Sequence, residues 1–225
     1  QHHAADLFVA NSDAAYFRGR VMKHKSFSEE RLKKMDWTMG YLTFYIGLNT
    51  KLPQIELHNY YLGNNFEEYA QKIIKNPGIM EKPYYYVNVL SRYNEECAPA
   101  GHESLFFVCP VPNLIYKKEW NDAETIVESI IEDFSERTAF NIQPHIVSKT
   151  IFTPQTWADT FNLYQGAGLG LSHAMLQIGA FRPNNIDEKY SNLFYVGAST
   201  VPGAGLPMAI ISSKLVTQRI TQNDK

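Results

Sequence analysis

The chain has 225 residues, a formal net charge of −2 and a hydrophobic share of 44%. This length fits one large domain or a domain with a further fragment, and the composition is normal for a globular core. No cluster of Lys and Arg is expected along one face, which argues against nucleic acid as a partner. The longest apolar stretches, Ser104–Pro112 and Leu206–Ile211, are far shorter than the roughly 20 residues of a membrane-spanning helix.

The residues that bind metals or form disulfides show no familiar spacing. Cys97 and Cys109 form no CxxC pair, and the seven histidines include no HxxxH or HExxH motif. We therefore expect a reduced cytoplasmic protein without a protein-bound metal.

The first segment predicts a strand that passes directly into a helix. Ala5–Ala10 is an apolar run of strand length, and the following Asn11, Ser12 and Asp13 offer turn and helix-capping side chains. A strand followed at once by a helix is typical of an α/β layer.

The middle of the chain predicts several strands and two covering helices. Asn65 with Glu68, and Asn121 with Glu124, have the spacing of capping boxes. The strands are rich in aromatic and β-branched residues and are expected at Met39–Asn49, Ile55–Leu62, Tyr84–Ser91, Ser104–Val111 and Ile146–Phe152. The helical stripes are Phe66, Tyr69, Ile73, Ile74, which ends before Pro77, and Ile126, Val127, Ile130, Ile131, Phe134. These patterns predict a mixed, mostly antiparallel sheet covered by helices.

The last sixty residues contain the segment most suggestive of chemistry. Pro154 is placed to start a helix, and Gly166, Gly168 and Gly170 form a loop without a clear preceding strand. Farther on, a buried strand is expected at Leu193–Val196, and it leads into the glycine-rich turn 197–207 and a helix over Met208–Ile220. A strand, a glycine turn and a helix N-terminus together present backbone amides to an anion or an electron-rich ring.

The turn resembles the C-terminal signature of the phytoene desaturase family of flavoproteins, which are related to the amine oxidases. The resemblance lies in Asn192–Gly197 and in Pro202-Gly203-Ala204-Gly205-Leu206-Pro207-Met208. Phe181-Arg182-Pro183, the Gly-Leu loop at 168–171 and the opening Val9–Asp13 resemble the same family in matching order. The resemblance covers most of the chain and is strongest over residues 160–220.

The resemblance implies an α/β fold with an α+β insertion: a partial, Rossmann-like FAD-binding domain plus a substrate domain with a mixed, mostly antiparallel sheet. Residues 1–20 and 160–225 would be returning segments of the FAD-binding domain, and residues 21–159 the substrate domain. No GxGxxG motif opening a strand–helix unit is present in this sequence. We therefore expect that half of the FAD site upstream of Gln1, and we expect this chain alone to be inactive.

The same resemblance places FAD against the turn. The expected cofactor-binding residues are Gly197, Ala198, Pro202, Gly203, Gly205, Leu206, Pro207, Met208 and Arg182. Related proteins often carry an acidic residue where Ala198 stands, and bacterial members often carry a His where Val201 stands. We therefore expect backbone contacts to FAD rather than side-chain contacts at these two positions.

The implied activity is oxidation of a C–C bond of a carotenoid by hydride transfer to FAD. The expected partners are the carotenoid, a membrane surface approached peripherally from the cytoplasm, and the N-terminal half of the same polypeptide. The alternatives are a hydroxycarotenoid 3,4-desaturase, another amine-oxidase-like flavoprotein such as a protoporphyrinogen oxidase, and a carotenoid- or lipid-binding protein with a degenerate flavin site.

Individual catalytic roles stay open in the sequence. Arg182 either faces the cofactor or pairs with an acid such as Asp187; His173 and Asp159 are weak candidates for a base, and none is assigned. Ten aromatic residues on predicted strands would line a polyene tunnel or pack the sheet: Tyr41, Phe44, Tyr45, Tyr60, Tyr61, Tyr84, Tyr85, Tyr86, Phe106 and Phe107.

Overall fold

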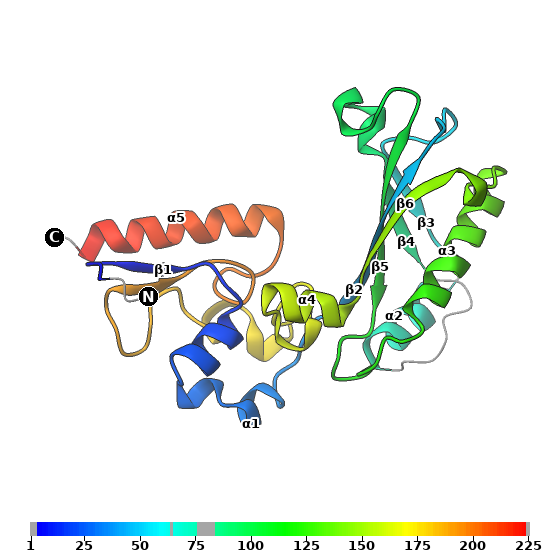
Figure 1. Cartoon of the computed structure of the whole chain (residues 1–225). Coiled ribbons are helices and arrows are strands. Elements are labelled where there is room, and N and C mark those ends of the chain that lie inside the picture. Colours follow the sequence, from blue (N-terminus) through cyan, green and yellow to red (C-terminus); the bar gives the residue numbers. More distant parts are fainter. Residues whose placement is uncertain (1–3, 64, 76–83, 224–225) are drawn as a thin grey trace. The chain divides into compact units, whose positions relative to one another are not determined.

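The computed structural model describes residues 4–63, 65–75 and 84–223. The chain divides into two compact units, which we call the terminal unit (Gln1–Thr38 with Trp157–Lys225) and the central unit (Met39–Thr156) (Figure 1). The boundaries between the units fall after Thr38 and Thr156, whereas the sequence predicted boundaries after residues 20 and 159. Residues 21–38 thus belong with the two ends of the chain.

The central unit is built on a five-stranded sheet in the order β3-β4-β5-β2-β6, with every neighbouring pair antiparallel. The strands are β2 (Gly40–Leu48), β3 (His58–Tyr61), β4 (Tyr85–Asn88), β5 (Glu103–Val111) and β6 (Ile146–Phe152). Each lies within or one residue beyond its predicted range. The described strands contain no parallel pair in this sheet, so it is simpler than the mixed sheet that we expected.

One face of this sheet carries the main core. Alternate residues of β2 and β5 point to the same side, and Phe44 stacks on its cross-strand partner Phe107 with ring centroids 4.4 Å apart. Helix α3 (Ala123–Thr138) covers this side, and its Phe134 meets Phe107 edge-to-face at 5.2 Å. Of the predicted stripe, Val127, Ile130, Ile131 and Phe134 are buried, as the spacing of the residues requires.

The start of α3 differs from the prediction. The helix begins at Ala123 with Asp122 at the N-cap position, and no side chain caps it. The predicted capping box of Asn121 with Glu124 is therefore wrong. The Asp122 carboxylate is instead engaged by Lys117 at 2.6 Å, and Glu124 is paired with Lys149.

The first capping box is confirmed. The Glu68 amide donates to Asn65 Oδ1 at 3.2 Å, and the Asn65 amide group donates to the Glu68 carboxylate at 2.9 Å. Helix α2 (Phe66–Lys75) follows directly. Tyr69 and Ile73 of its predicted stripe are buried, whereas the Ile74 side chain and the predicted stop at Pro77 lie outside the described residues.

The terminal unit joins the two ends of the chain in a two-stranded parallel sheet. Strand β1 (Phe8–Ala10) pairs with β7 (Leu193–Tyr195), and Val9 lies opposite Phe194. Helix α5 (Leu206–Asn223) runs beside these strands (Figure 1). The remaining helices are a π-helical segment (Tyr16–Val21), α1 (Glu29–Leu32) and α4 (Pro154–Phe161), whose first residue is the predicted proline.

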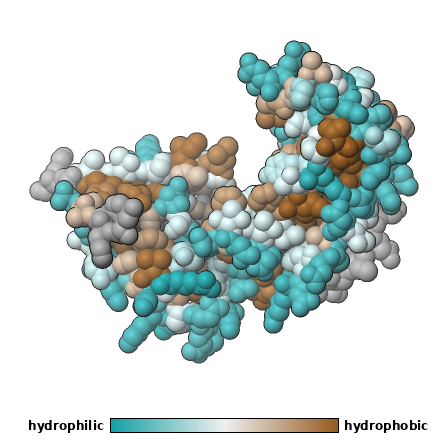
Figure 2. Space-filling model, in the orientation of Figure 1, coloured by the Kyte–Doolittle hydropathy of each residue, from teal (hydrophilic) through white to brown (hydrophobic). Residues whose placement is uncertain are grey.

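Much apolar surface of the terminal unit is uncovered. Phe8 and Val9 of β1 are 41% and 48% exposed, and Leu206 and Ile210 of α5 are 80% and 66% exposed. Figure 2 shows this apolar surface over β1 and α5. Across the described residues, no helix combines the length and hydropathy needed to cross a bilayer.

Candidate functional site

The glycine turn connects β7 to α5 as the sequence predicted. Gly197, Gly203 and Gly205 have φ angles of +109°, +138° and +123°, which residues with a side chain rarely adopt. The Ala209 amide donates to Gly205 O at 2.9 Å and forms the first helical bond of α5. The glycines are thus required by the shape of the turn itself, before any ligand is considered.

The helix start faces open space. In the described part of the chain, the amides of Gly205, Leu206 and Met208 have no hydrogen-bond acceptor, as expected for the first turn of a helix. A Cβ atom placed on Gly205 would meet only Met208, at 3.8 Å. This backbone is therefore accessible to an electron-rich group and suited to hold one.

The opposite side of the turn is packed against protein. A Cβ atom on Gly203 would lie 2.6 Å from His173 Nε2, and this nitrogen accepts a hydrogen bond from the Ala204 amide at 3.3 Å. A Cβ atom on Gly170 would similarly collide with the Ser199 hydroxyl, at 2.1 Å. The loop containing Gly170 and His173 thus supports the turn from behind.

Arg182 ties these two loops together. It is 3% exposed, and its guanidinium donates to Thr200 O at 3.1 Å. Further acceptors are the carbonyls of Leu171 (3.0 Å), Ser172 (3.1 Å), Gln177 (2.9 Å) and Ala198 (2.5 Å). A guanidinium has five N–H groups, so this carbonyl shell uses all of them. Burial lowers the pKa of Arg182 but leaves it charged.

The predicted alternative of an ion pair between Arg182 and Asp187 is wrong. The Asp187 carboxylate accepts from Tyr195 OH at 2.5 Å and lies 2.7 Å from His24 Nε2. It also accepts the amides of Lys189 and Tyr190. These bonds hold the pKa of Asp187 below its usual value against the opposing effect of burial. The positive charge of Arg182 is therefore surrounded by carbonyl dipoles, and no carboxylate of the described residues pairs with it.

A second buried arginine, Arg18, was not anticipated from the sequence. Its side chain is fully buried, with the guanidinium 3.9 Å from the centroid of the Tyr195 ring, and it pairs with Glu188. Arg18 lies in the π-helical segment, and local sequence carries no sign of partners 170 positions away. Burial lowers the pKa of Arg18, and the neighbouring Glu188 opposes this shift.

One group of side chains has the composition of a metal site. Ligand atoms of His24, Asp187 and Glu188 lie within 4.8 Å of one another. Asp187 already accepts four hydrogen bonds, and Arg18 pairs with Glu188, so the cluster is satisfied as a hydrogen-bonded network that links residues 18–24 to the loop before β7.

The structure thus brings most of the predicted site residues together. Gly197, Ala198, Pro202, Gly203, Gly205, Leu206, Pro207 and Met208 form the turn and the helix start, and Arg182 lies directly behind them. His173 supports the turn, and Asp159 lies exposed on α4. The amides of the turn and the buried charge of Arg182 are the features able to stabilise negative charge on a ligand.

The fold resembles that of a known redox enzyme. A solved oxidoreductase from Methanosarcina mazei superposes on 97% of this chain with a TM-score of 0.55 at 12% sequence identity, and the match covers 44% of that protein. At this identity the likeness concerns the fold alone. The chain therefore shares an α/β fold with a large antiparallel sheet with part of that protein.

Sequence relatives give the family. The chain is 34% identical to the zeta-carotene-forming phytoene desaturase of Myxococcus xanthus over 96% of its length, and 30% identical to the phytoene desaturase of Fusarium fujikuroi over 99%. It is also 30% identical to the neurosporene-forming phytoene desaturase of Rhodobacter capsulatus. No family model matches the chain. The chain is thus similar along nearly its whole length to phytoene desaturases and corresponds to a C-terminal region of them.

The match covers only part of those relatives. The chain spans 42% of the Myxococcus and Fusarium proteins and 44% of the Rhodobacter protein.

Proposed function

We propose that the full-length protein is an FAD-dependent carotenoid desaturase that oxidises a C–C bond of a carotenoid. The observation that carries this proposal is the turn between β7 and α5, with its free amides and open face, in a chain that matches carotenoid desaturases along nearly its whole length. FAD would supply the acceptor for the hydride that leaves the substrate when such a bond is oxidised.

The residues of this chain would hold FAD mainly through backbone. The amides of Gly205, Leu206 and Met208 are suited to an electron-rich edge of the cofactor, and any side chain at Gly205 would obstruct that approach. Arg182 would act as a positioning residue, because its fixed shell of carbonyls sets the geometry of the loop and keeps one positive charge behind the turn.

The second face of the central sheet is the proposed substrate surface. Strand alternation places Phe44, Tyr61, Tyr85 and Phe107 toward the core under α3, so these four of the ten aromatic candidates serve packing. The other six lie on the opposite face, where Tyr45 stacks on Phe106 with centroids 4.7 Å apart. An aromatic face of this kind suits a substrate without polar groups.

Two uncovered surfaces of the terminal unit indicate partners. The exposed β1 residues and the apolar side of α5 would be covered by the remainder of the polypeptide, since the relatives are more than twice as long as this chain. A separate loop exposes Met175 (82%), Leu176 (75%) and Phe181 (69%). We assign this loop to contact with a membrane surface, where carotenoids are dissolved.

The test uses the full-length protein. Gly205→Val is expected to abolish bound flavin and desaturation of phytoene, because a branched Cβ closes the open side of the turn. Gly101→Val is the matched control: Gly101 also has a positive φ, +76°, and a Cβ there would touch nothing within 4 Å. Flavin content is read from absorbance and products from chromatography. Equal flavin content in both variants, or no conversion of phytoene by the wild type, would contradict the proposal.

A further inference from the structure

An apolar pocket lies within the central unit, between α2 and the second face of the sheet. Its volume is about 310 Å³. On the helix side, Phe66, Tyr69, Ala70 and Ile73 repeat at the spacing of one helical face. On the sheet side, Tyr60, Tyr86 and Val108 form a row of paired residues across three strands. We call this cavity the α2 pocket.

The hydroxyl groups of Tyr69 and Tyr86 are engaged in hydrogen bonds, so these residues present their rings to the α2 pocket. Tyr69 OH donates to the carbonyls of Tyr84 and Pro110 at 3.1 and 3.2 Å. Tyr86 OH lies 2.6 Å from His58 Nδ1. The Tyr85 side chain points to the other face of the sheet, where its hydroxyl donates to Asp133 of α3 at 2.6 Å.

Tyr84 is the remaining buried tyrosine in the lining of the pocket. The Tyr84 hydroxyl is buried near Gly63 and has no hydrogen-bond partner among the described residues, while its ring stacks on Tyr69 with centroids 4.0 Å apart. The wall of the α2 pocket is therefore almost entirely apolar, although it contains several tyrosines.

Such an apolar wall discriminates between hydrocarbon groups and hydroxyl groups of a ligand. A hydrocarbon group gives up no hydrogen bonds when it enters the pocket. A hydroxyl group that enters gives up its hydrogen bonds to water and finds no new partner. An unpaired hydroxyl weakens binding by about tenfold or more.

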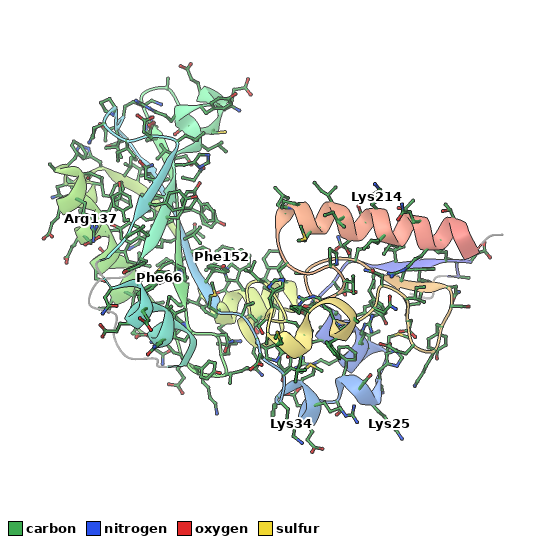
Figure 3. The ribbon with its side chains drawn as sticks, turned by 180° about the vertical axis from the view of Figure 1, so that it is seen from behind. Lys25, Lys34, Phe66, Arg137, Phe152 and Lys214 are labelled. Atoms are coloured by element: carbon green, nitrogen blue, oxygen red, sulfur yellow. The ribbon has the colours of Figure 1, made fainter. Side chains whose placement is uncertain are left out.

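The size and the rim of the pocket indicate which part of a ligand enters. A volume of about 310 Å³ lies at the low end for small-molecule sites, so the pocket accommodates one end of a long chain and not a whole C40 molecule. The rim is apolar and accessible: Tyr60 is 71% exposed, Leu62 61% and Phe66, labelled in Figure 3, 72%.

We propose that the α2 pocket holds one hydrocarbon end of the carotenoid substrate and selects an unoxygenated end over a hydroxylated one. This inference rests on the proposed function and sharpens it, because it favours an acyclic hydrocarbon such as phytoene over a hydroxycarotenoid. Three relatives of the chain are named for phytoene, which is a hydrocarbon.

The test is a binding measurement on the full-length, FAD-loaded protein. The probes are two fluorescent polyenes of equal length: a linear tetraene hydrocarbon and the same tetraene with a terminal hydroxyl group. Fluorescence anisotropy measures the binding of each probe. Ala70→Phe fills the α2 pocket and is expected to weaken binding of the hydrocarbon at least tenfold. Gln71→Phe is the control, since Gln71 is exposed on the same helix and does not line the pocket.

A second variant tests selectivity. Val108→Thr keeps the side-chain shape and adds a hydroxyl group to the wall. It is expected to reduce the preference for the hydrocarbon about fivefold, and the ratio between variants cancels the different solubility of the two probes in water. Unchanged binding in Ala70→Phe, or unchanged preference in Val108→Thr, overturns the proposal.

A competition experiment identifies the kind of ligand. Phytoene is expected to displace the hydrocarbon probe. Displacement by dihexanoyl phosphatidylcholine instead would identify a lipid-chain site and overturn it as well.

Activity is measured separately, so that the two proposals can fail independently. Ala70→Phe is expected to retain flavin and to raise the KM for phytoene. If the wild type binds the hydrocarbon probe through the α2 pocket but desaturates no carotenoid, the proposed function fails and the pocket stands. If it desaturates phytoene with the same KM in Ala70→Phe, the pocket assignment fails and the function stands.

Discussion

The two units of the chain are stabilised in different ways. The central unit surrounds one large apolar core of strand and helix residues, including Phe44, Phe107 and Phe134. The terminal unit has only small apolar clusters and is held by polar networks around Arg18, Arg182 and Asp187. It also leaves β1 and much of α5 uncovered. A unit that buries one large core is stabilised mainly by packing, whereas a unit with small apolar clusters relies more on the hydrogen bonds that fix its loops.

The largest effect is expected in the core of the central unit. Phe107→Ala removes a fully buried ring that stacks on Phe44 and should destabilise the protein by about 3–5 kcal/mol. Phe106→Ala, on the next residue of β5 but on the opposite face, should lower stability by about 1 kcal/mol. Chemical denaturation of both variants measures the difference. Equal losses would show that the two faces of the sheet are packed alike.

The next effect concerns the polar framework of the terminal unit. Arg182→Lys keeps the charge but has three donors for five carbonyls, so we expect a loss of about 2–3 kcal/mol together with reduced flavin content in the full-length protein. Arg20→Lys, at an exposed position, is the control and should change neither. A loss of turnover at unchanged melting temperature and flavin content would instead place Arg182 in the chemistry.

A smaller effect is expected at the surface loop assigned to the membrane. The double change Met175→Glu and Leu176→Glu should lower the affinity of the full-length protein for liposomes about tenfold, since two exposed apolar side chains would no longer enter the bilayer. Its melting temperature should stay within the error of the wild type. Vesicle sedimentation gives the affinity, and Leu90→Glu, at an exposed position of the central unit, serves as the control. Undiminished liposome binding would mean that the loop faces another part of the protein.

The smallest expected effect depends on pH. Burial raises the pKa of Asp13 from 3.8 to about 6, and its Oδ1 accepts the Tyr16 amide at 2.8 Å. Between these two pH values the folded state binds more protons than the unfolded state, so this group lowers stability as the pH rises from about 4 to 6. Asp13→Asn keeps the cap without the charge and should be more stable by about 1 kcal/mol at pH 7 but not at pH 4. Thermal unfolding at both pH values measures this difference, and an equal shift at both would contradict it.

Patterns with a short period predicted the central unit well. The aromatic and β-branched runs of β2, β5 and β6 and the stripe of α3 depend on residues close together in the sequence, and the strand bounds agree closely with the structure. The capping box at Asn121 failed because the helix begins one residue later than the spacing requires, at Ala123 with Asp122 at the N-cap position.

The candidate site was predicted in part. The glycines of the turn are visible in the sequence, since positive φ angles and a helix start require them. The carbonyl shell of Arg182 was not visible, because backbone acceptors carry no residue type that a pattern could reveal. The roles of His24 and Arg18 were missed for a related reason: Asp187 is 163 positions from His24, and Glu188 is 170 positions from Arg18.

The sequence by itself determined the strands, the two amphipathic helices, the glycine turn and the family resemblance, since all of these depend on neighbours along the chain. Only the tertiary structure decided that β1 pairs in parallel with β7, that Asp187 bonds to His24 instead of Arg182, and which aromatic residues face the core. It also engaged the hydroxyl groups of Tyr69 and Tyr86 in hydrogen bonds, so that their rings face the α2 pocket. These outcomes depend on contacts between distant segments, where many partners of similar chemistry compete and burial selects among them.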